Sequence, residues 1–273
     1  MKQEIFDSTP TYHLPPEIVT LVGNLPFSEN TVGMSDSHVL IYPDSVLKIE
    51  PVNPTSVREA QMLSWLDDRL PAPRVRCCVT ENGIQYLLMT RLNGKMACDR
   101  DYLSAPRRLA GLLAEALETV WSLDVSGCPH TTTLDDRLAF DRRVLENGDE
   151  AALCAPITYR GHRFPDAYRL YEWLLANRPT EHPAFSHGDF CLPNVFFSGD
   201  TLSGFLDLGQ AGISDRAYDL ALCHRSLWYN LAGVYGGAAS PDAETDALLL
   251  FDALGIRPDF DVLDYYNLLD LIG

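Results

Sequence analysis

Three polar side chains at fixed spacing lie where two apolar segments begin or end. Asp189 precedes and Asn194 begins the run NVFF. After a turn at 198–201 comes the run LSGFLDL, which ends at Asp207 and Leu208. We interpret the two runs as a hairpin, which brings Asn194 and Asp207 to the same end. Their oxygens suit Mg²⁺, which takes one or two protein groups together with phosphate oxygens and water. Asp189 is then placed to accept the proton of an attacking hydroxyl, as a phosphoryl-transfer site requires.

A second set of residues is suited to holding the phosphates of a nucleotide. Lys48 lies in the strand-like run SVLKIE, pointing away from the packed face, and Glu59 opens the helical segment that follows. A buried lysine needs a partner, so we expect an ion pair between Lys48 and Glu59 that fixes the ammonium group against the phosphates. The loop at 31–38, with Met34 and Ser35, offers backbone N–H groups to phosphate oxygens.

The elements that must position these residues form two predicted lobes. The first contains strand-like runs and one helical pattern, and the second contains mainly helical patterns. The strand-like runs are 39–42, 45–50, 74–80 and 84–90, and the helical patterns are 58–70, 107–123, 167–175, 242–254 and 261–272. We therefore predict an α+β fold. A small N-terminal antiparallel sheet with one helix occupies 1–92, and a larger, mainly helical C-terminal lobe occupies 93–273.

The composition limits the class of partner. The chain has 273 residues, and its 38 acidic against 21 basic side chains give a net charge of −17. Nucleic-acid phosphates are held by clustered Lys and Arg, so this balance disfavours nucleic acid and favours cationic partners. The seven cysteines show no metal-ligand spacing, and no apolar run reaches the roughly 18 residues of a membrane span. We predict a cytoplasmic monomer or weak dimer that binds neither nucleic acid nor membranes.

Two longer segments carry a family resemblance. HGDFCLPN and GFLDLGQAGISDRAYDLALC resemble the catalytic and metal-binding segments of the aminoglycoside phosphotransferases, in the branch that modifies the 3'-hydroxyl (kanamycin kinases). The likeness covers nearly the whole chain, including VGMSDSHV, REAQMLSWLDDRLPAPRV, LLMTRLNG, SGCPHTTTLDDRL and YYNLLDLIG. It implies a two-lobed fold similar to that of protein kinases, with ATP and Mg²⁺ as cofactors. It also implies a cationic aminoglycoside as acceptor, and hence antibiotic resistance.

The resemblance also implies a role for individual residues. Asp189 is the catalytic aspartate and meets the acceptor, Asn194 and Asp207 are Mg²⁺ ligands, and Lys48 with Glu59 serves the α- and β-phosphates.

The remaining positions concern the base and the acceptor. Met89 lines the adenine pocket, the backbone of Thr90 and Leu92 meets the base, and Asp270 is an acid retained for the aminoglycoside.

Several positions depart from the family pattern. Gln210 stands where relatives commonly carry arginine, and Tyr229, Asn230 and Leu271 stand where acids are expected for the acceptor. These departures leave phosphoryl transfer intact. They keep a second hypothesis open, in which the protein is a kinase of a small metabolite such as choline, homoserine or a sugar. A non-catalytic nucleotide sensor is a third reading, which the complete set of site residues disfavours. A metal-dependent hydrolase on His187 and Asp189 lacks further histidines at useful spacing.

Other polar residues near the motifs have structural explanations. We expect His187 to brace the loop by hydrogen bonds, and Asp215 and Asp219 to cap the next helix and anchor the catalytic loop. His224 and Arg225 are expected on a solvated helix face.

Overall fold

The computed structural model describes residues 12–30 and 37–272, which form two compact units. Unit 1 takes the described residues up to Ser56 together with Val75–Arg91, and unit 2 takes Val57–Arg74 together with the chain from Leu92 onward. Helices combine with antiparallel sheets, so the predicted α+β class is confirmed. The division into lobes at 1–92 and 93–273 stays a prediction.

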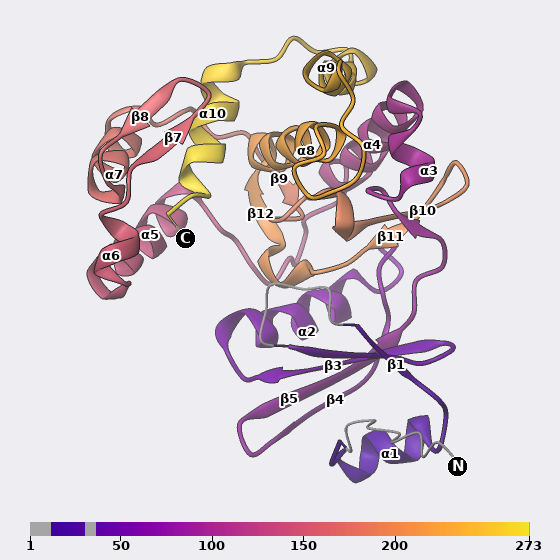
Figure 1. Ribbon diagram of the computed structural model, residues 1–273. Coiled ribbons are helices and arrows are strands. Elements are labelled where there is room, and N and C mark those ends of the chain that lie inside the picture. Colours follow the sequence, from indigo (N-terminus) through magenta and orange to yellow (C-terminus); the bar gives the residue numbers. More distant parts are fainter. Residues whose placement is uncertain (1–11, 31–36, 273) are drawn as a thin grey trace, which may run out of the picture. The chain divides into compact units, whose positions relative to one another are not determined.

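Unit 1 is built on a five-stranded antiparallel sheet (Figure 1). In spatial order its strands are β1 (Ser28–Asn30), β2 (His38–Ile41), β3 (Ser45–Pro51), β5 (Ile84–Thr90) and β4 (Val75–Glu81), preceded in the chain by helix α1 (Pro16–Val22). Leu47 and Ile49 of β3 pack with Leu40, Leu88 and Ile18 of α1 in one apolar cluster. Side chains alternate between the faces of a strand, so Lys48 lies on the opposite face, as expected.

Helix α2 (Pro54–Leu66) begins in unit 1 and continues in unit 2. It starts four residues before the predicted 58–70, because a reciprocal cap forms there. Asn53 Oδ1 accepts from the Ser56 N–H at 2.9 Å, and Ser56 Oγ accepts from the Asn53 N–H at 3.0 Å. The helix also ends earlier than predicted, at Leu66 instead of residue 70. The chain turns after Leu66, and Asp68 takes a left-handed conformation with φ +59°.

Unit 2 is mainly helical. Its helices are α3 (Arg100–Leu103), α4 (Pro106–Trp121), α5 (Leu134–Asn147), α6 (Glu150–Leu153), α7 (Ala167–Ala176), α8 (Arg216–Leu231), α9 (Ala243–Leu254) and α10 (Phe260–Leu269). The four helical patterns predicted after residue 92 correspond to α4, α7, α9 and α10. Helix α10 ends at Leu269 instead of 272 because the chain turns there. The apolar stripe of α4 is buried at Leu109, Leu112, Leu113, Ala116, Leu117 and Val120, whereas Trp121 is partly buried. Helices α4, α8 and α9 pack together (Figure 1).

Short strands in unit 2 carry the loops with the polar motifs. Strand β10 pairs with β11 and β6, β9 pairs with β12, and β7 pairs with β8. Their bounds are β6 (Lys95–Met96), β7 (Ile157–Tyr159), β8 (His162–Phe164), β9 (Pro183–Ser186), β10 (Val195–Ser198), β11 (Thr201–Phe205) and β12 (Gly212–Asp215). The predicted hairpin is therefore confirmed as β10 and β11. Within the described ranges, no helix is long and apolar enough to cross a membrane.

Candidate active site

Asp189 lies in the loop between β9 and a 3₁₀ turn, η1 (Leu192–Asn194). The Asn194 side chain donates from Nδ2 to two atoms of Asp189, its carboxylate Oδ2 at 2.9 Å and its backbone oxygen at 3.0 Å. Asn194 is 8% exposed, whereas Asp189 is only partly buried. An amide that binds both the main chain and the side chain of Asp189 restricts the rotamer of its carboxylate.

The β10–β11 hairpin brings Asp207 to the same end as Asn194. The Leu206 N–H donates to the Asn194 backbone oxygen at 2.9 Å, one residue before Asp207. Asp207 has φ +53° and precedes the turn η2 (Leu208–Gln210). This left-handed backbone is uncommon for a residue other than glycine, and short polar side chains tolerate it best. The structure thus places the segments of Asn194 and Asp207 together.

The donor atoms of this end of the hairpin fit Mg²⁺. Because Nδ2 of Asn194 donates to Asp189, Oδ1 is the amide atom that could bind a cation. Asp207 is exposed and adds carboxylate oxygens. One amide oxygen and one carboxylate match the donor set of an ion that keeps several waters and shares phosphate oxygens of a substrate.

The loop that carries Asp189 is anchored by Asp219 of α8, as predicted. The Asp219 carboxylate is fully buried and accepts from Ser186 Oγ at 2.9 Å and from the backbone N–H groups of His187 and Gly188 at 3.0 Å each. Asp215 caps α8 by accepting from the Ala217 N–H at 3.0 Å, which was also predicted.

His187 has the bracing role expected of it, in an altered form. Bonds from the ring to backbone carbonyls were expected, but Nδ1 instead accepts from the backbone N–H of Asp189 at 3.3 Å. The ring is fully buried between Phe190 and Phe205. Nε2 has no hydrogen-bond partner among the residues that the structure describes. A ring with this surrounding supports the loop and is not a hydrolytic base.

Cys191 lies beside Asp189 and was not singled out from the sequence. Burial, followed by the charge of the Asp189 carboxylate, raises the pKa of the Cys191 thiol. A thiol in this state is neutral at physiological pH and a poor nucleophile. Cys191 is therefore a poor candidate for a nucleophile at this site.

Lys48 shares its face of β3 with Glu50, two residues on. Lys48 Nζ lies 3.4 Å from Glu50 Oε1, and the two side chains are 16% and 11% exposed. Glu50 is a partner that alternation along the strand predicts but that we did not name from the sequence. Glu59 of α2 is 3% exposed and belongs to the other unit, so its ion pair with Lys48 stays a prediction.

The residues predicted to bind the adenine fall in both units. Met89, which is buried, and Thr90 end strand β5 in unit 1, and Leu92 begins the second part of unit 2. Met34 and Ser35 lie outside the described residues.

Asp270, which was predicted to bind the aminoglycoside, is bound to other side chains of unit 2. Its carboxylate accepts from Tyr218 Oη at 3.0 Å and forms an ion pair with Arg225 of α8. The expectation of a solvated face for His224 and Arg225 is wrong. His224 is 4% exposed and the Arg225 side chain 15%, because α8 packs against both α9 and α10.

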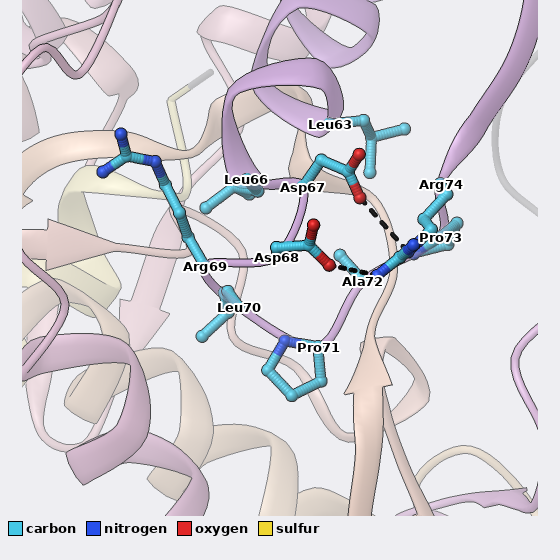
Figure 2. Close-up of a pocket in the computed structure, with 10 residues that line it drawn as sticks. All are labelled: Leu63, Leu66, Asp67, Asp68, Arg69, Leu70, Pro71, Ala72, Pro73 and Arg74. Carbon is cyan, nitrogen blue, oxygen red and sulfur yellow. Dashed lines mark hydrogen bonds and ion pairs between the residues drawn. The ribbon is translucent and has the colours of Figure 1, made fainter.

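A pocket of about 280 Å³ lies at the end of α2, within unit 2 (Figure 2). Leu63, Leu66 and Leu70 line it, and Arg74 forms ion pairs with Asp67 and Asp68. Both of its acids are thus already paired with a guanidinium.

Comparisons with known proteins agree with this chemistry. The sequence model of the phosphotransferase enzyme family matches residues 32–251. An aminoglycoside 3'-phosphotransferase of Enterococcus faecalis is 34% identical over 259 residues, which are 94% of this chain and 89% of that protein.

Two solved structures share the fold. An aminoglycoside-3'-phosphotransferase of type VIII has a TM-score of 0.74 at 23% identity, covering 94% of this chain and 97% of that one. An aminoglycoside phosphotransferase from Streptomyces rimosus, in complex with ADP and streptomycin, has a TM-score of 0.72 at 23% identity, covering 93% and 95%. The predicted kinase-like fold class is thereby confirmed.

Proposed function

The chain belongs to the phosphotransferase enzyme family, in its aminoglycoside 3'-phosphotransferase branch, and we propose that it transfers the γ-phosphoryl group of ATP to the 3'-hydroxyl of an aminoglycoside. The resemblance drawn from the sequence is confirmed at the level of family. The substrate, the position modified and the roles of single residues are our proposals for this chain.

One observation carries the proposal. The Asn194 amide holds the Asp189 carboxylate at 2.9 Å, while the Asn194 backbone is tied to the strand end that leads into Asp207. A proton acceptor and two oxygen ligands for a cation are therefore built from one hairpin and its entry turn. Phosphoryl transfer depends mainly on such positioning and on stabilisation of charge.

In the proposed reaction Asp189 accepts the proton of the acceptor hydroxyl and orients its oxygen. That oxygen forms a bond to the γ-phosphorus, the bond from this phosphorus to the β–γ bridging oxygen breaks, and ADP leaves. Asn194 and Asp207 would hold Mg²⁺, which neutralises phosphate charge when bound. The neutral Cys191 thiol beside Asp189 takes no part in bond formation.

The residues that we propose for binding ATP are those predicted from the sequence. We assign Lys48 to the α- and β-phosphates, with Glu59 as the carboxylate that orients its ammonium group. Met34 and Ser35 belong to the phosphate loop, and Met89 and the backbone of Thr90 and Leu92 to the adenine. The ADP in the Streptomyces rimosus structure supports ATP as the donor. The reaction would take place in the cytoplasm, where ATP is made.

The acceptor assignment rests on charge and on the names of the relatives. A net charge of −17 attracts a polyammonium compound. One observation favours a second candidate, a kinase of a less cationic alcohol. The Asp270 carboxylate is already paired with Arg225, and Tyr229 and Asn230 supply no charge. A metabolite kinase of the same fold would need no acidic acceptor pocket.

A coupled ADP-release assay tests the proposal against this alternative. Purified protein is given ATP, Mg²⁺ and either kanamycin, choline, homoserine or a free sugar. We expect kcat/KM for kanamycin to exceed that of every metabolite by at least an order of magnitude. Faster turnover of choline or homoserine than of kanamycin would mean that the substrate is a metabolite and not an aminoglycoside.

A further inference from the structure

Arg58 lies next to Glu59 in α2 and contacts the loop that carries Asp207. Its Nη2 donates to the Ala211 backbone oxygen at 2.8 Å, and its Nε donates to the same oxygen at 3.2 Å. Ala211 follows the η2 turn directly, four residues after Asp207. Both partners belong to unit 2. A guanidinium that grips one carbonyl with two N–H groups fixes direction as well as distance.

The same guanidinium reaches a second segment. Nη2 of Arg58 donates to Thr132 Oγ1 at 2.6 Å. The segment of Thr132 is itself bound to β12, because the Thr132 N–H donates to the Ile213 oxygen at 2.8 Å and Ser214 Oγ donates to the Thr132 oxygen at 2.7 Å. Arg58 therefore joins a closed junction of three segments and not a mobile surface loop.

Gly212 makes room for this junction. Its φ is +155°, and a Cβ atom there would lie 2.7 Å from the His130 backbone oxygen and 3.0 Å from Arg58 Nη2. A side chain at this position would push against the guanidinium and the backbone. The His130 backbone cannot move aside as a flexible side chain can, so the close approach of the His130 segment at this junction favours glycine at position 212.

The segment that begins at Arg58 also binds the strand before Asp207, through Pro71. The Phe205 N–H donates to the Pro71 backbone oxygen at 3.0 Å, and Pro71 is one of the residues around the pocket of Figure 2. The chain on both sides of Asp207 is therefore tied to the segment that runs from Arg58 to Pro71.

We propose that Arg58 is a positioning residue that holds the Asp207 loop to helix α2, so that one rigid element sets both the Asp207 carboxylate and Glu59. The proposal rests on the proposed function, in which Asp207 binds Mg²⁺ and Glu59 orients Lys48. Arg58 touches no substrate and acts through Ala211. Its loss loosens the loop and weakens the binding of Mg²⁺ together with nucleotide.

The test is calorimetry of ADP binding at a series of Mg²⁺ concentrations, for the wild type and for Arg58→Gln, Arg58→Lys and Arg69→Gln. Arg69 is the matched control, since it stands on the same segment but packs its guanidinium over Trp65 at 4.9 Å. We expect Arg58→Gln to raise the Mg²⁺ concentration for half-maximal enhancement of ADP binding about tenfold, Arg58→Lys to fall between, and Arg69→Gln to match the wild type.

A merely structural role would lower the melting temperature of Arg58→Gln and leave its Mg²⁺ dependence unchanged, which overturns the proposal. An equal shift in Arg69→Gln would overturn it as well. If Arg58→Gln does not fold, Arg58→Lys decides by the same criterion. Failure of the wild type to show any Mg²⁺-enhanced ADP binding would instead remove the proposed function itself, and this proposal with it.

Discussion

The Asn194 side chain donates from one nitrogen to both the backbone oxygen and the carboxylate of Asp189. The two residues are five apart, and the 3₁₀ turn between them closes this contact. Asp189 is therefore oriented before any substrate binds. Preorganised polar groups contribute most to catalysis, because no reorganisation is needed at the moment of reaction.

Asp189→Ala removes the proposed proton acceptor. We expect kcat to fall about 10²- to 10⁴-fold, the usual contribution of a positioned acid or base, with ADP affinity within a factor of about three of the wild type. Steady-state kinetics and ADP calorimetry measure the two effects. Asp200→Asn, in the exposed hairpin turn, is the control and should behave as wild type. Near-normal turnover of Asp189→Ala would assign the base elsewhere.

Lys48→Met tests the donor side. Loss of a charged hydrogen-bond donor is worth about 1.5 to 3 kcal/mol, so we expect kcat/KM for ATP to fall about 10- to 100-fold. The matched control is Lys95→Met, because Lys95 is half exposed and pairs with Asp99 and Asp101. Unchanged ATP kinetics in Lys48→Met would mean that the ammonium group does not serve the phosphates.

Gly188→Ala tests how tightly the catalytic loop is packed. Gly188 has φ +80°, and a Cβ atom there would lie 2.2 Å from the Gln210 backbone oxygen. Strain and backbone collision together should lower the free energy of unfolding by about 3 kcal/mol or more. Gly199→Ala shares the positive φ, at +63°, but meets no atom within 4 Å, so about 1 to 2 kcal/mol is expected. Urea denaturation distinguishes them, and equal losses would refute the packing explanation.

Asp141 gives the stability a pH dependence of unusual sign. Burial raises the pKa of this carboxyl group from 3.8 to about 7, against the nearby Arg137 guanidinium. The folded protein thus keeps the proton between about pH 4 and 7 while the unfolded chain releases it, so stability falls as pH rises through this window. At 1.36 kcal/mol per unit, the contribution lost between pH 5.5 and 8 is about 2 kcal/mol.

Asp141→Asn should remove this loss. Urea unfolding of wild type and variant at pH 5.5 and 8 measures the difference, with Glu146→Gln, an exposed acid on the same helix, as control. If the variant retains the wild-type pH slope, Asp141 is ionised in the folded protein.

Much of the fold follows from local pattern. The β3 and β5 strands, the α4 stripe and the β10–β11 hairpin were predictable because apolar periodicity and turn residues act within a few positions. Helix α2 shows the limit, since its start depends on the cap between Asn53 and Ser56, which the apolar stripe does not reveal. Boundaries set by such single contacts are not visible in periodicity.

For the site too, local pattern was informative and long-range contacts were not. Spacing predicted that a hairpin brings the segments of Asn194 and Asp207 together, and the structure confirms this. The roles of Asp189, Asn194 and Asp207 stay predictions. Long-range partners were missed. Arg225 was expected in solvent, yet it pairs with Asp270 at the end of α10, 45 residues away in the sequence. Tertiary packing alone brings such pairs together.

The most direct test of the account is the position of the transferred phosphate. Kanamycin and tobramycin share a core and cationic groups, but tobramycin lacks the 3'-hydroxyl. Transfer requires a hydroxyl within about 3 Å of Asp189 and in line with the phosphorus, so attraction alone gives no product. We expect NMR of the products to show one phosphate on the 3'-oxygen of kanamycin, and tobramycin to bind without modification. Stoichiometric phosphorylation of tobramycin on any oxygen would contradict the account.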